Sequence, residues 1–408
     1  MNVQKNLIKL YLLEFFHSLI PAYVIERLFW ESRGMSVKEV VICEILYAAG
    51  VVLLEIPSGA AADRYGRKPL IVAGAFLAML EMALLLGAHR FWHFAALVLI
   101  AAVAKACTSG ALNALLYDTL AASSRQKEFE GILGRMNACG ILAAVMAALG
   151  GSALAAKVNM EWNYVLSAAS LLLSLWAALT LREPPLHANG ESEKPFNALD
   201  ARENQAALPS ARSGSVRASV RLFGSSPVLI MVLLQGMLLG ACLVYLDEFW
   251  QLYLNRLSIP VIWFGAYSCL LLAVRLPGSL LAGWLVRRVP PIRIVTGAGV
   301  GIVLALLAAG LVPGAVGLAA MASAFLLAGV LEPVVAGFLH HRIDSSMRAT
   351  AESFQSLGTK AATAAVGLGF GYFTDSMSLY AGFLFLGVLA GAGMLLTGAP
   401  MLLRRNRE

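Results

Sequence analysis

The chain alternates between long apolar runs and short polar stretches from one end to the other. Twelve runs are long enough to cross the hydrocarbon core of a bilayer, which takes roughly 20 apolar residues in a helix. Because unsatisfied backbone polar groups are very costly in lipid, these runs are expected to be helical. The pattern therefore predicts an all-α polytopic membrane protein. The twelve predicted transmembrane helices cover about residues 6–31, 38–62, 69–88, 91–121, 130–156, 160–181, 226–251, 259–285, 291–312, 315–340, 351–373 and 377–402.

One long polar segment interrupts this pattern. Residues 182–225 are rich in Pro, Ser, Ala and charged residues and show no apolar period. That composition is typical of a linker. We expect a cytoplasmic linker between an N-terminal six-helix bundle, residues 1–181, and a C-terminal six-helix bundle, residues 226–408.

The charge is low and unevenly placed. Only 13% of the 408 residues are charged, whereas soluble domains have roughly 25%. The formal net charge of +7 does not indicate nucleic-acid binding, because the cations collect in short loops rather than on one soluble face. The positive-inside rule places the cation-rich loops and both termini in the cytoplasm, as in a multi-pass protein of the plasma (inner) membrane. These loops carry Arg64, Arg67, Lys68, Arg125, Lys127, Arg135, Arg287, Arg288, Arg293, Arg342 and Arg348.

Motifs for cofactor or metal chemistry are missing from the sequence. The five cysteines lie in or beside apolar runs without C-x-x-C spacing, which indicates small core residues. No G-x-x-x-x-G-K-[ST] loop, H-E-x-x-H helix or nucleophile elbow occurs. We therefore expect no cofactor, no metal site and no enzyme activity.

The most informative polar loop is Gly-Ala-Ala-Ala-Asp-Arg-Tyr-Gly-Arg-Lys, which runs from Gly59 to Lys68 between the second and third spans. Gly59 is expected to let two helices approach closely, and Gly66 to supply a tight turn. We expect Asp63 to lie beside the start of the next helix, where a carboxylate can meet free N–H groups. The cations Arg64, Arg67 and Lys68 are expected to hold the loop in the cytoplasm.

This loop resembles the signature loop of the major facilitator superfamily of membrane transporters. The resemblance implies two six-helix halves that expose a central cavity to each side of the membrane in turn. It also implies a charge relay from Asp63 through Arg67 to Asp118, at the inner end of the fourth span, which latches the halves shut on the cytoplasmic side. A shift of 224 residues lays the first half on the second, with Arg287 on Asp63 and Arg342 on Asp118. We therefore expect one strong latch, not two.

Several ionisable residues lie inside the predicted spans. Such a group near the bilayer middle costs at least ~2.5 kcal/mol, so each needs a function or a partner. In the resembled fold the first, fourth, seventh and tenth helices line the cavity, which favours Glu14, His17, Lys105 and Glu332 as cavity groups. Desolvation lets a buried carboxyl load and release a proton near neutral pH, so Glu14 is the first candidate for proton coupling and Glu332 the second. A structural ion pair remains the alternative for each.

Other intramembrane residues complete the expected site. Arg275 and Lys360 are further cavity candidates or ion-pair partners. Glu81 falls on the third span, outside the cavity in the resembled fold, and is expected to be a buried structural partner or a lipid-shielded carboxyl that stays protonated. Aromatic and amide groups that could shape the pocket are Tyr11, Gln235 and Tyr245.

The stretches Glu55–Lys68 and Arg348–Ser353 look like the drug-efflux-type branch of the superfamily. Against this, the Gly- and Pro-bearing exporter motif of the fifth span is incomplete: Gly131 and Gly140 are present, but the proline is not. The expected function is proton-coupled export of a small amphipathic molecule by a monomer in the lipid bilayer. Uptake or exchange of a polar metabolite and a lipid flippase of this fold remain alternatives.

Overall fold

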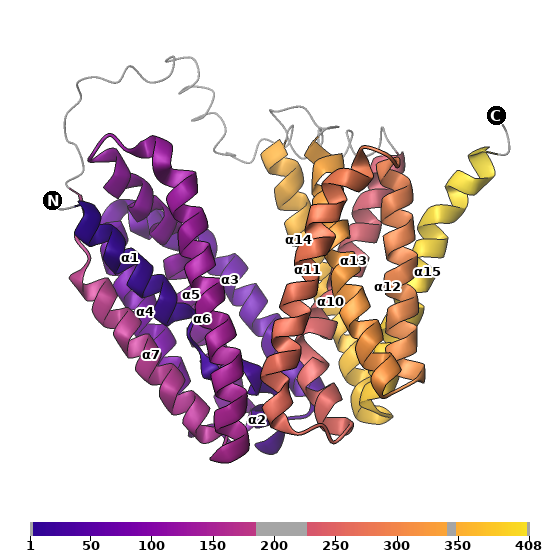
Figure 1. Cartoon of the computed structure of the whole chain (residues 1–408), viewed down its shortest axis with the longest axis horizontal. Coiled ribbons are helices and arrows are strands. Elements are labelled where there is room, and N and C mark those ends of the chain that lie inside the picture. Colours follow the sequence, from indigo (N-terminus) through magenta and orange to yellow (C-terminus); the bar gives the residue numbers. More distant parts are fainter. Residues whose placement is uncertain (1–2, 185–226, 341–347, 406–408) are drawn as a thin grey trace.

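Two groups of long helices make up the computed structural model, which describes residues 3–184, 227–340 and 348–405 (Figure 1). No strand occurs within these residues. The first group contains α1 (Val3–Ser18), η1 (Pro21–Val24), α2 (Glu26–Ser32), α3 (Val37–Tyr65), α4 (Arg67–Leu85), α5 (Phe91–Ala121), η2 (Gln126–Glu128), α6 (Phe129–Lys157) and α7 (Glu161–Thr180). The second contains α10 (Pro227–Arg256), η3 (Val261–Trp263), α11 (Phe264–Val286), α12 (Pro291–Leu311), α13 (Ala315–His340), α14 (Arg348–Ser376) and α15 (Leu379–Arg405). Nearly all of the linker predicted at 182–225 falls outside the described residues, so the boundaries of the two predicted bundles stay a prediction.

Eleven stretches of the described chain are long and apolar enough to cross a membrane, so the protein is a multi-pass membrane protein. The eleventh predicted span, 351–373, lies within α14, which is helical but is not one of these eleven stretches. Polar residues such as Thr359, Lys360 and Thr363 dilute the hydropathy of this helix.

The prediction of one continuous helix over 6–31 is wrong, because the chain breaks at Pro21. Ile20 is extended, with φ −118° and ψ 90°, as expected for a residue that precedes a proline. At the break, the carbonyl oxygen of Pro21 accepts a hydrogen bond from Asn163 Nδ2 on α7 at 3.1 Å. Beyond the break, the short helix α2 lies at the end of the molecule where the two groups meet (Figure 1).

The two groups touch at the α2 end, called the closed end below, and diverge toward the end where α1 begins and α15 finishes, called the open end (Figure 1). At the closed end, backbones approach without room for side chains. A Cβ atom on Gly265 of α11 would lie 2.3 Å from the carbonyl oxygen of Ala148 on α6. A Cβ atom on Gly371 of α14 would lie 2.9 Å from Cα of Lys38 on α3. Glycine is thus required for these helices to meet.

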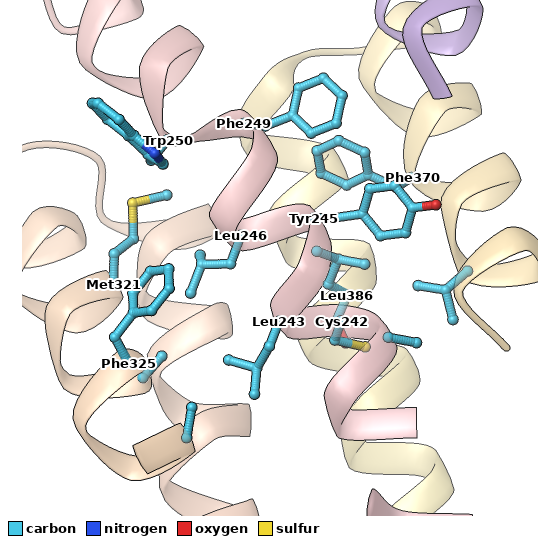
Figure 2. Packing of buried hydrophobic residues seen from close by; sticks show 14 of the residues in the cluster. Cys242, Leu243, Tyr245, Leu246, Phe249, Trp250, Met321, Phe325, Phe370 and Leu386 are labelled. Carbon is cyan, nitrogen blue, oxygen red and sulfur yellow. The ribbon is translucent and has the colours of Figure 1, made fainter. Parts of the chain in front are cut away.

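The core of the second group is aromatic. Tyr245 and Phe249 of α10 pack on Phe370 of α14, with ring centroids 5.5 Å and 5.0 Å apart (Figure 2). Phe325 of α13 and Trp250 of α10 are buried in the same cluster. This packing holds α10 in place between α13 and α14. The polar residues near the C-terminal end of α10 are thereby held in position toward the first group.

Candidate functional site

The loop between α3 and α4 forms an ion pair with α5. Arg67 of α4 pairs with Asp118 of α5, and its Nη1 also donates to the carbonyl oxygen of Ala114 at 2.6 Å. Both charged side chains are about three-quarters buried. The contact that the sequence predicted between Arg67 and Asp118 is therefore present, and it ties two helices of the first group together.

Asp63 does not lie where the sequence analysis expected it. α3 continues to Tyr65, so Asp63 is in the last turn of α3, exposed, and within the described chain it forms no ion pair with Arg67. The start of α4 is instead met by Glu183, whose Oε1 accepts from the backbone N–H of Arg67 at 2.6 Å. Gly66, at φ 95°, makes the turn, and a Cβ atom there would lie 2.8 Å from Glu183.

The remaining residues of this loop make few contacts with other helices in this conformation. Among the described residues, no other helix has an atom within 4 Å of where a Cβ atom on Gly59 would be, so no close helix approach is seen at this glycine. The guanidinium of Arg64 lies over the ring of Tyr65, and Lys68 is half-buried. A cavity of about 330 Å³ between α3 and α5 is lined by Gly59, Asp63 and Arg67, which leaves the loop room to repack.

Glu14, His17 and Lys105, three of the residues predicted to face a cavity, line one of about 160 Å³ between α1 and α5. Glu14 Oε1 accepts a hydrogen bond from Ser18 Oγ at 3.4 Å. A Cβ atom on Gly140 of α6 would lie 2.9 Å from the same oxygen, so a larger residue there would displace this carboxylate. Three helices of the first group thus converge on Glu14.

A larger cavity of about 300 Å³ shares His17 and Lys105 with the first and extends toward the closed end. Glu81 of α4, only 8% exposed, lines it, so the expectation that this residue lies away from the cavity is wrong. The same cavity also reaches Arg27 and Glu248.

Sequence reasoning missed the most buried charge of the site. Arg27 of α2, 4% exposed, pairs with Glu44 of α3 and with Glu248 of α10 in the other group. Its backbone N–H donates to Oε1 of Gln251 on α10 at 2.9 Å, and the amide of Gln251 donates to the carbonyl oxygen of Tyr23 at 2.8 Å. The only available signal was a Glu-Arg pair inside a stretch taken as one apolar helix.

Further polar contacts join the two groups at the closed end. Asp375 of α14 accepts from the backbone N–H groups of Val37 and Lys38 at 3.0 Å and 3.1 Å. Arg256 of α10 pairs with Glu31 of α2. The hydrogen bonds and ion pairs identified between the described residues of the two groups lie at this end.

The second group has its own cavity of about 280 Å³, lined by the predicted residues Arg275 and Glu332 and by Asp247. Arg275 Nη2 lies 3.6 Å from Asp247 Oδ2, and the guanidinium stacks over the ring of Phe325 at 4.7 Å. Arg275 thus has a structural partner, while Glu332 is exposed to the cavity.

The other candidates lie outside these cavities. Gln235, 2% exposed, donates to Thr397 Oγ1 at 2.9 Å, and Tyr245, 1% exposed, donates to the carbonyl oxygen of Thr363 at 2.8 Å (Figure 2). Both turn toward neighbouring helices of the second group, so neither lines a cavity in this conformation. Tyr11 packs half-buried against the core of the first group, and Lys360 is half-buried on α14. Within the described chain, no group of three or more His, Cys, Asp or Glu side chains could hold a metal ion.

Solved structures of known transporters share this fold. A mutant of the nucleoside transporter NupG superposes with a TM-score of 0.71 at 14% identity, covering 96% of this chain and 99% of that one. A bacterial homologue of the human lysosomal transporter Spinster, inward-facing and unoccupied, gives 0.70 at 16% identity, covering 97% and 95%. A D-xylose–proton symporter gives 0.65 at 12% identity, covering 97% and 96%. A search of curated proteins gives no match. The sequence model of the Major Facilitator Superfamily matches residues 10–340, and the chain belongs to this superfamily.

Proposed function

We propose that the protein is a secondary active transporter in a conformation closed to the outside and open to the cytoplasm. The observation that carries this proposal is the confinement of the hydrogen bonds and ion pairs identified between the described residues of the two groups to the closed end. Transport by alternating access requires that such contacts form at one end and break at the other.

The sidedness rests on the distribution of cations. The loops of the open end carry Arg64, Arg67 and Lys68 between α3 and α4, and Arg287 and Arg288 between α11 and α12. The loops of the closed end have fewer cations. By the positive-inside rule, the open end faces the cytoplasm. We further propose that the protein acts as a monomer in the plasma membrane.

The substrate that we propose is a small amphipathic molecule, exported in exchange for protons. The two cavities that contain His17 and Lys105 combine acids with aromatic side chains: Glu14 and Glu81 of the first group and Glu248 of the second, with Tyr23 and Trp30. Aromatic faces and carboxylates together suit a molecule with an apolar body and a cationic end. Glu14 is the proposed proton carrier and Glu332 the second candidate.

Uptake or exchange of a polar metabolite is the competing proposal. It is favoured by Lys105 and Arg275, which bring cations into the cavities. The fold is also shared with a nucleoside transporter and a D-xylose–proton symporter.

Flux in proteoliposomes under an imposed pH gradient tests these proposals. Export coupled to protons moves labelled solute against the proton flow, whereas symport moves both in the same direction. Glu14→Gln should abolish gradient-driven flux but preserve solute exchange. Glu130→Gln, an exposed position in the first turn of α6, is the matched control and should change neither. Normal gradient-driven flux in Glu14→Gln would remove Glu14 from the mechanism.

A further inference from the structure

Three carboxylates surround a single buried arginine at the closed end. Nη2 of Arg27 contacts both Glu44 and Glu248, and its Nε donates to Glu248 Oε2 at 3.1 Å. Its Nη1 lies 3.8 Å from Glu26 Oε2. Glu26 and Glu44 belong to the first group and Glu248 to the second, so this Arg27 cluster spans the interface between the groups.

The cluster has more negative than positive charge. One guanidinium can offset one carboxylate, yet three lie around it, and each is at least two-thirds buried. Crowding like charges into a place with little water is unfavourable unless some of them are neutralised. Burial raises the pKa of Glu26, although the adjacent Arg27 opposes this.

The surrounding groups do not restore the balance. The cavity that borders the cluster adds two bases, His17 of α1 and Lys105 of α5, and one more acid, Glu81 of α4. The other titratable groups near the cluster are neutral or acidic: Tyr23 of η1, Cys43 and Tyr47 of α3, Tyr164 of α7, and Tyr245 and Asp247 of α10. Arg27 Nη1 is buried and has no hydrogen-bond acceptor within the described chain.

We propose that the Arg27 cluster binds a proton each time the closed end closes. Closure brings Glu248 of the second group against Glu26 and Glu44 of the first, and a proton from the outer solution joins one of the three carboxylates to form a carboxyl. Opening carries Glu248 away on α10, leaves Arg27 with the two acids of its own group, and returns the proton to solution. The cluster is thus a proton site additional to Glu14, and this proposal rests on the proposed function only in requiring that the two groups separate at this end.

The direction of the pH effect follows from linkage. The closed form binds more protons than the form that is open at this end, so acidic solution favours closure and alkaline solution favours opening. For one linked proton, the ratio of the two forms changes by up to about tenfold per pH unit between the two relevant titrations.

Distance measurements between spin labels test this without any solute or gradient. Labels on Lys157 of α6 and Ser378 beside α15, both exposed at the closed end, report the separation of the groups. The labels enter as cysteines in a chain whose five native cysteines are replaced. In the otherwise native protein the short-distance fraction should rise as the pH falls from about 8 to about 5, within the linkage limit of tenfold per unit.

Two neutral substitutions and one control show which carboxylates take part in proton binding. Glu44→Gln and Glu26→Gln each remove one carboxylate but leave the Arg27–Glu248 contact between the groups. Each should flatten the pH dependence and raise the closed fraction at alkaline pH. Glu31→Gln removes an acid that pairs one-to-one with Arg256 at the same end and should keep the native pH dependence.

A closed fraction that does not change with pH in the native protein overturns the proposal. So does a loss of pH dependence in Glu31→Gln as large as in the two cluster variants. The outcome is separable from that of the proposed function: pH-dependent closure without gradient-driven flux would retain the proton site and reject export by proton exchange. Conversely, gradient-driven flux that depends on Glu14, together with closure that does not depend on pH, would support export by proton exchange and reject the proton site at the Arg27 cluster.

Discussion

Asp375 provides the sharpest test of how the closed end is held. It lies near the C-terminal end of α14, and its two carboxylate oxygens accept from the N–H groups of Val37 and Lys38, the first two residues of α3. A carboxylate at this position meets both free N–H groups and the positive end of the helix dipole. Because donor and acceptor belong to different groups of helices, the contact exists only while the closed end is closed.

Asp375→Ala should therefore shift the conformational equilibrium rather than unfold the protein. Replacing a capping side chain by Ala typically costs about 1 kcal/mol. Because Asp375 is exposed, the free-energy cost of Asp375→Ala should not exceed that value. All of that loss falls on the closed form, so the ratio of closed to open forms should drop roughly fivefold. The distance between labels at Lys157 and Ser378 measures this directly.

Ser36 offers a matched control on the same helix. Its Oγ accepts from the backbone N–H of Glu39 at 3.3 Å, and the Glu39 side chain accepts from the N–H of Ser36 at 2.9 Å, which forms a capping box within the first group. Ser36→Ala should cost about as much, but in both conformations alike. It should lower the thermal unfolding temperature and leave the closed-to-open ratio unchanged. The reasoning is refuted if Asp375→Ala leaves the ratio unchanged, or if Ser36→Ala shifts it equally.

Three further substitutions test other contacts. Gly265→Ala puts a Cβ atom against the backbone of α6 and should open the closed end in the same distance measurement, whereas Gly283→Ala, with no atom within 4 Å, should not. Asp118→Asn breaks a partly buried ion pair within the first group and should lower the free energy of unfolding by roughly 1–2 kcal/mol, measured by thermal denaturation. Gly140→Ala crowds the carboxylate of Glu14 and should reduce gradient-driven flux while the protein remains folded, as judged by its melting temperature.

The sequence was sufficient for features that depend on local pattern. Apolar runs predicted the spans, and the loop motif led to the contact between Arg67 and Asp118, which the structure contains. Glu14, His17 and Lys105 were grouped because their helices were expected to line one cavity. The spans follow from hydropathy alone, whereas the contact and the grouping followed from the resemblance to the superfamily.

Features that depend on where a helix ends could not be read in the same way. Asp63 was expected at the start of α4, but α3 extends two residues past it. The backbone N–H of Arg67 at the start of α4 is instead bound by Glu183, which lies 116 residues after Arg67 in the chain. Tyr245 looked like a pocket residue because of its helix, yet the face on which it lies turns to Phe370. Helix boundaries and helix rotation are set by packing, which hydropathy does not report.

The Arg27 cluster was missed for a further reason, since it depends on a break that hydropathy hides. Read as one helix over 6–31, the first span would carry Arg27 straight on along its axis. Pro21 instead ends the helix, and α7 stabilises the break: Asn163 donates to the carbonyl oxygen of Pro21, and Ser167 Oγ accepts from the N–H of Ala22 at 3.0 Å. A buried carbonyl or N–H without such a partner would cost about 1–3 kcal/mol, so the polar groups of α7 are what make the break stable. The break is in turn what places α2 between the two groups, where a single arginine can contact carboxylates from both.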